Sequence, residues 1–225
     1  AYFQAYSNTY APVERLRALY DEALRHPAIV GLVIGTRPDC VDEEKLSYFQ
    51  EIAKTKFIAL EYGIESCYNN TLKKINRGHT FEEAVEAVNM TNAHGLHCGA
   101  HFILGLPFET EDMMLDSAAI ISKLPINTVK FHQLQILRDT TFEQMYLQDP
   151  SHFKFFTFEE YVSFFIKFLE RLNPEIIVER FSGEVPPRYL VNPGWGLIRN
   201  DQVIIAIEKE MQTQNTWQGK KYKHI

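Results

Sequence analysis

Short apolar runs alternate with longer amphipathic segments along most of the chain, and this alternation most constrains the fold. Strand-like runs rich in apolar and β-branched residues occur at about 1–7, 29–36, 57–64, 97–104, 128–136 and 175–181. Segments of helical periodicity are expected at 12–25, 42–53, 81–94, 111–123, 158–172 and 200–213. Strands that alternate with helices are typical of βαβ units, so the sequence predicts an α/β protein with a parallel sheet.

Polar residues mark the starts of several expected helices. Thr80 with Glu83 and Thr157 with Glu160 each form a capping-box pattern. Each unit of strand and helix takes about 25–40 residues, which suits either a (βα) barrel or a doubly wound sheet. We expect a core of such units over 1–182. Residues 183–199 are rich in Pro, Gly and aromatic residues, so 183–225 is expected to be an extension packed on the core.

Composition excludes some classes of function. The chain carries 29 acidic and 23 basic residues, a net charge of −6, which is unfavourable for general nucleic-acid binding. No apolar run approaches the ~18 residues of a membrane span. The three cysteines Cys40, Cys67 and Cys98 are too widely spaced for a disulfide framework or a zinc site. We therefore expect a cytoplasmic protein with no membrane partner and no metal ligands within this chain.

The two ends of the chain carry expectations of their own. The chain opens without Met on the apolar and aromatic run Ala-Tyr-Phe-Gln-Ala-Tyr. A domain rarely begins inside a core strand, so we expect that sequence upstream of Ala1 is missing. At the other end, the basic tail at 220–224 is expected to be solvated.

Polar side chains cluster where the expected strands end. The second strand ends in Thr36-Arg37-Pro38-Asp39, and Glu65 closes the third. His101 lies in the fourth strand, and His132 in the fifth. Active sites of parallel barrels are built at this edge from several strands, so we expect these side chains to converge there. Taken singly, each also has a structural interpretation: His101 as a core histidine, Arg37 as a partner of Asp39, and Glu65 as a turn cap.

Two motifs resemble the radical S-adenosylmethionine (radical SAM) superfamily. The segments 61–66 (EYGIES) and 71–80 (TLKKINRGHT) resemble its fourth strand and the start of the following helix. The segment 101–110 (HFILGLPFET) resembles its fifth strand, with Phe108 in place of the common Gly. Residues 31–40, 130–137 and the end of the chain resemble a subgroup near the elongator catalytic subunit and oxygen-independent coproporphyrinogen oxidase.

The resemblance implies a fold and a reaction. The fold is a partial, open (βα)6 TIM-type barrel that lacks its first strand. The reaction is reductive cleavage of SAM at a 4Fe–4S cluster, giving a 5′-deoxyadenosyl radical that acts on an unknown substrate. The partners implied are SAM, an external electron donor, and a substrate that is a tRNA, a small molecule or a protein.

The resemblance also assigns site residues. Glu65 matches a ribose contact, Arg77 matches the group that binds the SAM carboxylate, and His101 matches a ribose or adenosine contact. The full set of cofactor-binding candidates is Gln4, Tyr6, Asn8, Gly35, Thr36, Arg37, Glu65, Arg77, His101, Leu104, Gly105 and Pro107. The substrate-facing candidates are His132, Gln133 and Gln135. No residue is assigned as catalytic.

One departure from the family changes the expected activity. The family holds its cluster on three closely spaced cysteines, typically C-x3-C-x2-C, and this sequence has no such triplet. We therefore expect an inactive fragment that binds neither cluster nor SAM well, although the full-length protein would bind both. Two other functions stay open. One is a cluster-independent (βα) barrel lyase or hydrolase using His101, Glu65 and His132. The other is a non-catalytic barrel that binds RNA or protein.

Overall fold

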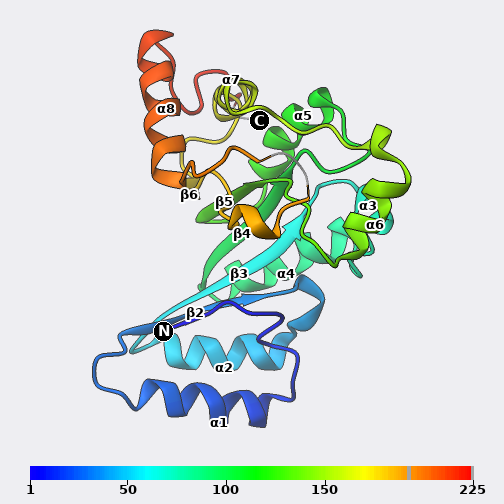
Figure 1. Ribbon diagram of the computed structural model, residues 1–225. Coiled ribbons are helices and arrows are strands. Elements are labelled where there is room, and N and C mark those ends of the chain that lie inside the picture. The colour runs from blue at the N-terminus through cyan, green and yellow to red at the C-terminus, as the bar shows by residue number, and fades with distance from the viewer. Residues whose placement is uncertain (192–193, 224–225) are drawn as a thin grey trace.

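Six parallel strands form one sheet, and their spatial order is their order in the chain (Figure 1). The structure, a computed structural model, describes residues 1–191 and 194–223. The strands are β1 (Tyr2–Phe3), β2 (Gly31–Thr36), β3 (Phe57–Glu65), β4 (His97–Leu104), β5 (Thr128–Gln133) and β6 (Ile177–Arg180). Within the described residues β1 and β6 do not pair, so the sheet is open. The expected parallel α/β fold of the open-barrel type is confirmed.

Helices connect the strands and cover the outside of the sheet. They are α1 (Val13–Leu24), α2 (Glu43–Ala53), α3 (Asn69–Lys74), α4 (Phe81–Ala93), α5 (Glu111–Ile121), α6 (Thr141–Gln148), α7 (Phe158–Leu169) and α8 (Asn200–Thr213). Three short 3₁₀ helices are η1 (Pro38–Cys40), η2 (Pro150–His152) and η3 (Pro187–Tyr189). In Figure 1, α1 and α2 lie together beside β2, and α7 and α8 lie at the other end of the molecule. None of the helices in the described part combines the length and the apolar character that crossing a membrane requires.

Two of the predicted helix starts have the capping box that the sequence indicated. Thr80 and Thr157 each form a complete capping box with the glutamate three residues later. Helices α3 and α6 were not predicted. The missed signal for α6 is Thr140, whose side chain accepts a hydrogen bond from the backbone N–H of Glu143. Strand β1 is also much shorter than the predicted 1–7.

The apolar core lies between the sheet and its outer helices. On β5, the fully buried ring of Phe131 packs edge-on against Phe165 and Phe168 of α7, with ring centroids 5.4 and 5.0 Å apart. On the other side, Tyr20 of α1 packs against Phe49 of α2 at 5.6 Å. Burial of such rings supplies a large share of the apolar driving force, and it fixes the strands whose ends carry the polar residues.

The chain beyond β6 packs against the rest of the protein. Trp195 donates its indole N–H to the backbone oxygen of Phe156 at 2.9 Å, and Val203 and Ile207 of α8 are fully buried. Near the end of the chain, Lys221 pairs with the buried carboxylate of Glu170. Lys220, Lys221 and Lys223 are nevertheless exposed, as predicted for a solvated tail. His224, which also belongs to that prediction, lies outside the described residues.

We predict that Gly31→Ala destabilises the protein far more than Gly35→Ala, although both glycines lie on β2. A Cβ at Gly31 would stand 2.2 Å from the backbone oxygen of Phe57 on β3, whereas a Cβ at Gly35 would stand 3.3 Å from the nearest atom. Forcing apart a packed strand pair costs about 1–3 kcal/mol. Urea unfolding of both variants measures the difference, and equal losses of stability would contradict the close approach of β2 and β3.

Candidate functional site

A cavity of about 660 Å³ opens at the carboxyl ends of the strands. Most of the site residues predicted from the sequence line this cavity. The predicted residues that line it are Gln4, Tyr6, Gly35, Thr36, Arg37, Glu65, Arg77, His101, His132, Gln133 and Gln135. A cavity of this size is large enough for a cofactor or a small molecule. The side chains of β2, β3, β4 and β5 therefore meet in one place, as a site at the edge of a parallel sheet requires.

Four predicted residues lie outside this cavity. Asn8 donates its side-chain amide to the backbone oxygens of Phe3 and Gly35, at 3.0 and 2.7 Å, so it holds the loop after β1. Leu104 and Gly105 line a small neighbouring cavity. Pro107 lines neither the main cavity nor this neighbouring one. The structure therefore gives Asn8 a structural task and separates Leu104, Gly105 and Pro107 from the main cavity.

The buried carboxylate of Glu61 is the centre of a polar cluster at the wall of the cavity. Glu61 lies in the middle of β3 and is only 5% exposed. It accepts hydrogen bonds from the Tyr2 hydroxyl at 2.8 Å, from His101 Nε2 at 3.1 Å and from Lys130 Nζ at 2.5 Å. Lys130 also pairs with Glu179 of β6 at 3.3 Å. We call these five residues the Glu61 cluster, and they join β1, β3, β4, β5 and β6 from the inside of the sheet.

Hydrogen bonding decides the charge state of this cluster. Burial alone raises the pKa of Glu61, but the bonds from His101, Lys130 and Tyr2 outweigh it and lower the pKa to about 2. Burial opposes the charge on Lys130 as well, but the hydrogen bond to Glu61 leaves its pKa raised. Glu61 is therefore ionised and Lys130 is positively charged at neutral pH. Because both charges are paired, the cluster is polar without an isolated buried charge.

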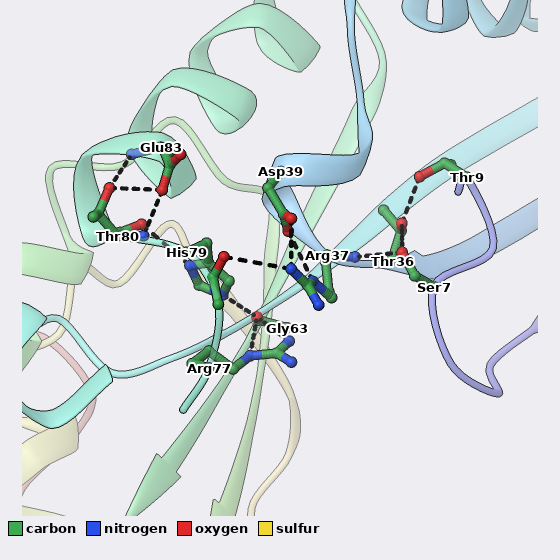
Figure 2. A network of polar contacts seen from close by, with 11 residues as sticks. Ser7, Thr9, Thr36, Arg37, Asp39, Gly63, Arg77, His79, Thr80 and Glu83 are labelled. Atoms are coloured by element: carbon green, nitrogen blue, oxygen red, sulfur yellow. Dashed lines mark hydrogen bonds and ion pairs between the residues drawn. The ribbon is translucent and has the colours of Figure 1, made fainter. Parts of the chain in front are cut away.

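A second polar group forms around the backbone oxygen of Gly63. This oxygen accepts hydrogen bonds from Arg77 Nη2 at 2.6 Å, from Arg77 Nε at 3.2 Å and from His79 Nε2 at 3.3 Å (Figure 2). Arg77 Nη2 also lies 3.3 Å from the carboxylate of Glu65. A Cβ at Gly63 would stand 2.6 Å from both Arg77 Nη2 and Glu65 Oε1, so only glycine allows this approach.

Glu65 combines a left-handed backbone conformation with a largely buried carboxylate. It has φ +72° at a shift of register between β3 and β4, which turns its side chain toward the cavity. Burial raises the pKa of Glu65, while the charges of Arg77 and His101 lower it in part. Hydrogen bonds from hydroxyl groups of a ligand would therefore stabilise its ionised form.

The end of β2 forms the rim of the cavity beside Arg77. The Thr36 hydroxyl hydrogen-bonds those of Ser7 and Thr9, at 3.0 and 2.5 Å, and this ties the loop after β1 to β2 (Figure 2). Arg37 binds Asp39 through Nε at 2.8 Å and Nη2 at 2.5 Å. The expected Arg37–Asp39 pair is therefore present, and it positions Arg37 at the rim.

The residue His132 differs from the other polar groups of the cavity because burial keeps it neutral. Burial, together with the nearby charges of His101, Arg180 and Lys130, lowers its pKa to about 4. Its ring lies 6.1 Å from that of His101, measured between centroids. At neutral pH it therefore offers an uncharged donor and acceptor to a ligand.

Sequence reasoning missed three important members of the site. Tyr2, Glu61 and Lys130 belong to the Glu61 cluster, although none was selected as a site residue. The signal for two of them is present in the sequence, because a charged residue in the middle of a buried parallel strand needs a partner. Glu61 and Lys130 are such residues, and their opposite charges on β3 and β5 were the available clue.

The cysteines do not form a cluster site. Cys40, Cys67 and Cys98 are buried and unpaired, and they lie on η1, after β3 and in β4. Burial raises the pKa of Cys67 and raises that of Cys98 to about 12, whereas a cluster needs thiolates. Within the described residues no group of three potential metal ligands is found. The residues present therefore do not fit an iron–sulfur cluster.

The fold and the cavity define an open α/β barrel with a ligand site at the carboxyl edge of its parallel strands. Residues 2–121 match the family model described as the radical SAM superfamily, and residues 126–213 match the model of the radical SAM C-terminal domain. The chain therefore belongs to the radical SAM superfamily.

Related proteins and a solved structure agree with this assignment. The protein YtqA of Bacillus subtilis is 34% identical over 225 residues, all of this chain and 69% of YtqA. MJ0486 of Methanocaldococcus jannaschii is 33% identical over 98% of the chain and 68% of its own length. The structure of Elp3 from Methanocaldococcus infernus superposes with a TM-score of 0.71 at 21% identity, covering 84% of this chain but only 43% of Elp3. That likeness shows a shared fold.

We predict that Glu61 contributes stability that is lost in acid. Its pKa is about 2 in the folded protein against an ordinary value of 4.5. Because folding lowers the pKa, the contribution is complete above pH ~5, amounts to about 3 kcal/mol, and disappears as the pH falls toward 2. The free energy of unfolding of wild type should therefore exceed that of Glu61→Gln by about this much at pH 7 and by progressively less between pH 5 and 2.

The control for this prediction is Glu86→Gln, which changes an exposed glutamate of α4 in the same way. It should keep the pH dependence of the wild type. If Glu61→Gln also follows the wild-type curve in urea unfolding at each pH, then Glu61 does not carry the acid-sensitive stability.

Proposed function

We propose that this chain is the SAM-binding part of a radical SAM enzyme. The observation that carries the proposal is the group formed by Arg77, Gly63 and Glu65 at the mouth of the main cavity. It presents a guanidinium and a carboxylate side by side, and SAM carries a carboxylate and a ribose diol that suit these two groups. Membership in the superfamily supports SAM as the ligand.

Each of the two side chains has a distinct task in this proposal. Arg77 uses Nε and Nη2 to bind the oxygen of Gly63, and Nη1 has no partner among the described residues. We assign Nη1 to the SAM carboxylate, because a guanidinium fixed on one edge is already oriented for an anion. Glu65 would accept hydrogen bonds from the ribose hydroxyls, and the ends of β1 and β2 at Gln4, Gly35 and Thr36 would form the adjoining wall.

The remaining lining residues would surround the adenosine and the substrate. His101 is fixed through Nε2 by Glu61, so its ring keeps one orientation toward the cavity. His132, Gln133 and Gln135 lie on the β5 side, away from Arg77 along the sheet, and we assign them to the substrate. The aliphatic and aromatic walls would limit the access of water to the bound ligands.

A 4Fe–4S cluster would have to be held by cysteines outside these 225 residues. The three cysteines of the chain are buried and separated, and about a third of YtqA and of MJ0486 has no counterpart in this chain. We propose that the complete enzyme carries the cluster on that additional sequence and depends on an external electron donor. This chain alone would then be inactive.

We predict that Arg77→Ala weakens the binding of S-adenosylhomocysteine to this chain by ten- to hundredfold. A charge-assisted hydrogen bond to a carboxylate contributes about 1.5–3 kcal/mol, which corresponds to this change in dissociation constant. Ligand-observed NMR titration suits the weak affinity expected without a cluster. Arg25→Ala, an exposed arginine after α1, is the matched control and should bind as wild type does. Equal affinities of the two variants would reject the assignment of Arg77.

Iron and sulfide analysis tests the class of enzyme. The complete gene product should hold about four iron and four sulfide per chain, and this chain should hold none. A lyase or hydrolase working through His101, Glu65 and His132 would instead turn over its substrate without iron. Turnover by the iron-free complete protein would therefore overturn the proposal.

A further inference from the structure

A second cavity of about 480 Å³ lies next to the main one. After β6, residues 183–191 return across β4 and β5 (Figure 1). The second cavity lies between residues 183–191 and 194–199, called the returning segment, and the end of β5. Gln133, Gln135 and Val185 line both cavities. The two spaces are therefore adjacent compartments that meet at the two glutamines.

The lining of the second cavity is mainly apolar. Its apolar side chains are Val185, Pro186, Pro187, Leu190, Trp195, Leu197 and Ile198. The charged side chains among the described lining residues are Glu184 and Arg199, and their charges cancel. Glu184 is already bound to the backbone N–H of Asn200 at 2.8 Å, where it caps the start of α8. The cavity therefore offers apolar contact and no net charge to a ligand.

The returning segment is fixed where the two cavities meet. Gly183 accepts a hydrogen bond from Gln133 Nε2 at 3.1 Å and donates its N–H to Gln133 Oε1 at 2.7 Å. A Cβ at Gly183 would stand 2.9 Å from His132 Nδ1 and 3.0 Å from Gln135 Oε1. The nitrogen and the oxygen of the Gln133 amide are each bonded to Gly183, so Gln133 is fixed there. Gln135 and His132 are the neighbouring polar side chains that can contact a ligand spanning the junction.

We propose that the second cavity binds the apolar part of an uncharged small organic substrate, and that Gln135 and His132 hold the polar reacting end of that substrate at the junction. This inference rests on the proposed function for the position of SAM in the main cavity. The apolar part would lie against Leu190 and Trp195, and the polar end would reach the main cavity. The inference selects a small molecule among the three substrate classes that the family resemblance leaves open.

Charge argues against a nucleic acid in this cavity. A nucleic acid brings a phosphate for each nucleotide, and proteins bind that backbone with clusters of Lys and Arg. The described lining offers Arg199 alone, opposite Glu184. An uncharged ligand needs no counter-charge, and its burial against apolar side chains is favourable in proportion to the area removed from water.

The test uses N-phenyl-1-naphthylamine, an uncharged arene whose fluorescence rises in apolar sites. We expect saturable binding to the wild-type chain with an affinity that does not change between 50 and 500 mM salt. Val185→Lys should weaken binding at least tenfold, because it places a charged group in the cavity. Val30→Lys makes the same change at a valine that is 78% exposed, and it should bind the probe as wild type does.

A second measurement separates this inference from the proposed function. Ile198→Lys, at a residue that lines the second cavity and not the main one, should weaken arene binding and keep its affinity for S-adenosylhomocysteine. Arg77→Ala should keep its affinity for the arene. If Val185→Lys fails to fold by circular dichroism, Val185→Ser takes its place and should weaken arene binding severalfold. Absence of saturable arene binding in wild type, or equal losses in the Val185 and Val30 variants, would overturn the inference. So would salt-sensitive tRNA binding that displaces the arene, because it would place a nucleic acid in this cavity.

Discussion

The Glu61 cluster is the interaction on which the rest of the structure depends. A closed barrel holds its strands by hydrogen bonds around the whole circle, whereas this sheet is open between β1 and β6. The side chains of Tyr2, His101 and Lys130 converge on Glu61, and Lys130 continues the connection to Glu179 on β6. Polar side-chain contacts across the inside of the sheet thereby link the edge strands β1 and β6, which no backbone hydrogen bonds join to each other within the described residues.

The same cluster determines what kind of cavity the open sheet can enclose. Paired buried charges cost desolvation energy that good geometry has to offset, so removing one partner leaves the other uncompensated. Inside the cavity, Glu61 and Lys130 satisfy each other and fix His101, while His132 stays neutral. A ligand therefore meets a polar interior without a free charge. The charged groups available to it lie at the mouth, at Arg77 and Glu65.

Much of the fold could be predicted because its signals are local. Capping residues such as Thr80 fix helix starts, and the alternation of apolar strands with helices fixes the parallel sheet. The convergence of Arg37, Glu65, Arg77, His101 and His132 on one cavity also follows, because parallel strands place their carboxyl ends together. The roles of these side chains toward a cofactor remain predictions.

What could not be predicted depends on contacts between distant residues. Asn8 looks like a ligand group in the sequence, but the backbone oxygens of Phe3 and Gly35 take up its amide. Tyr2 and Lys130 are 128 residues apart, and only the folded sheet brings them to one carboxylate. Phe108 has φ +72°, a backbone conformation that favours the glycine common at this position in the family. A phenylalanine in the sequence gives no sign of that conformation.

Two glycines show how the chain divides its interior into compartments. At Gly63 the missing side chain lets Arg77 and Glu65 meet over a backbone oxygen, which builds the charged mouth of the main cavity. At Gly183 it lets the returning segment lie against His132 and Gln135, which forms the junction with the apolar cavity. In both places a Cβ would displace polar side chains rather than apolar packing. These two glycines therefore lie at boundaries of the binding compartments, and the chemistry at each boundary follows from the polar side chains that the glycine leaves room for.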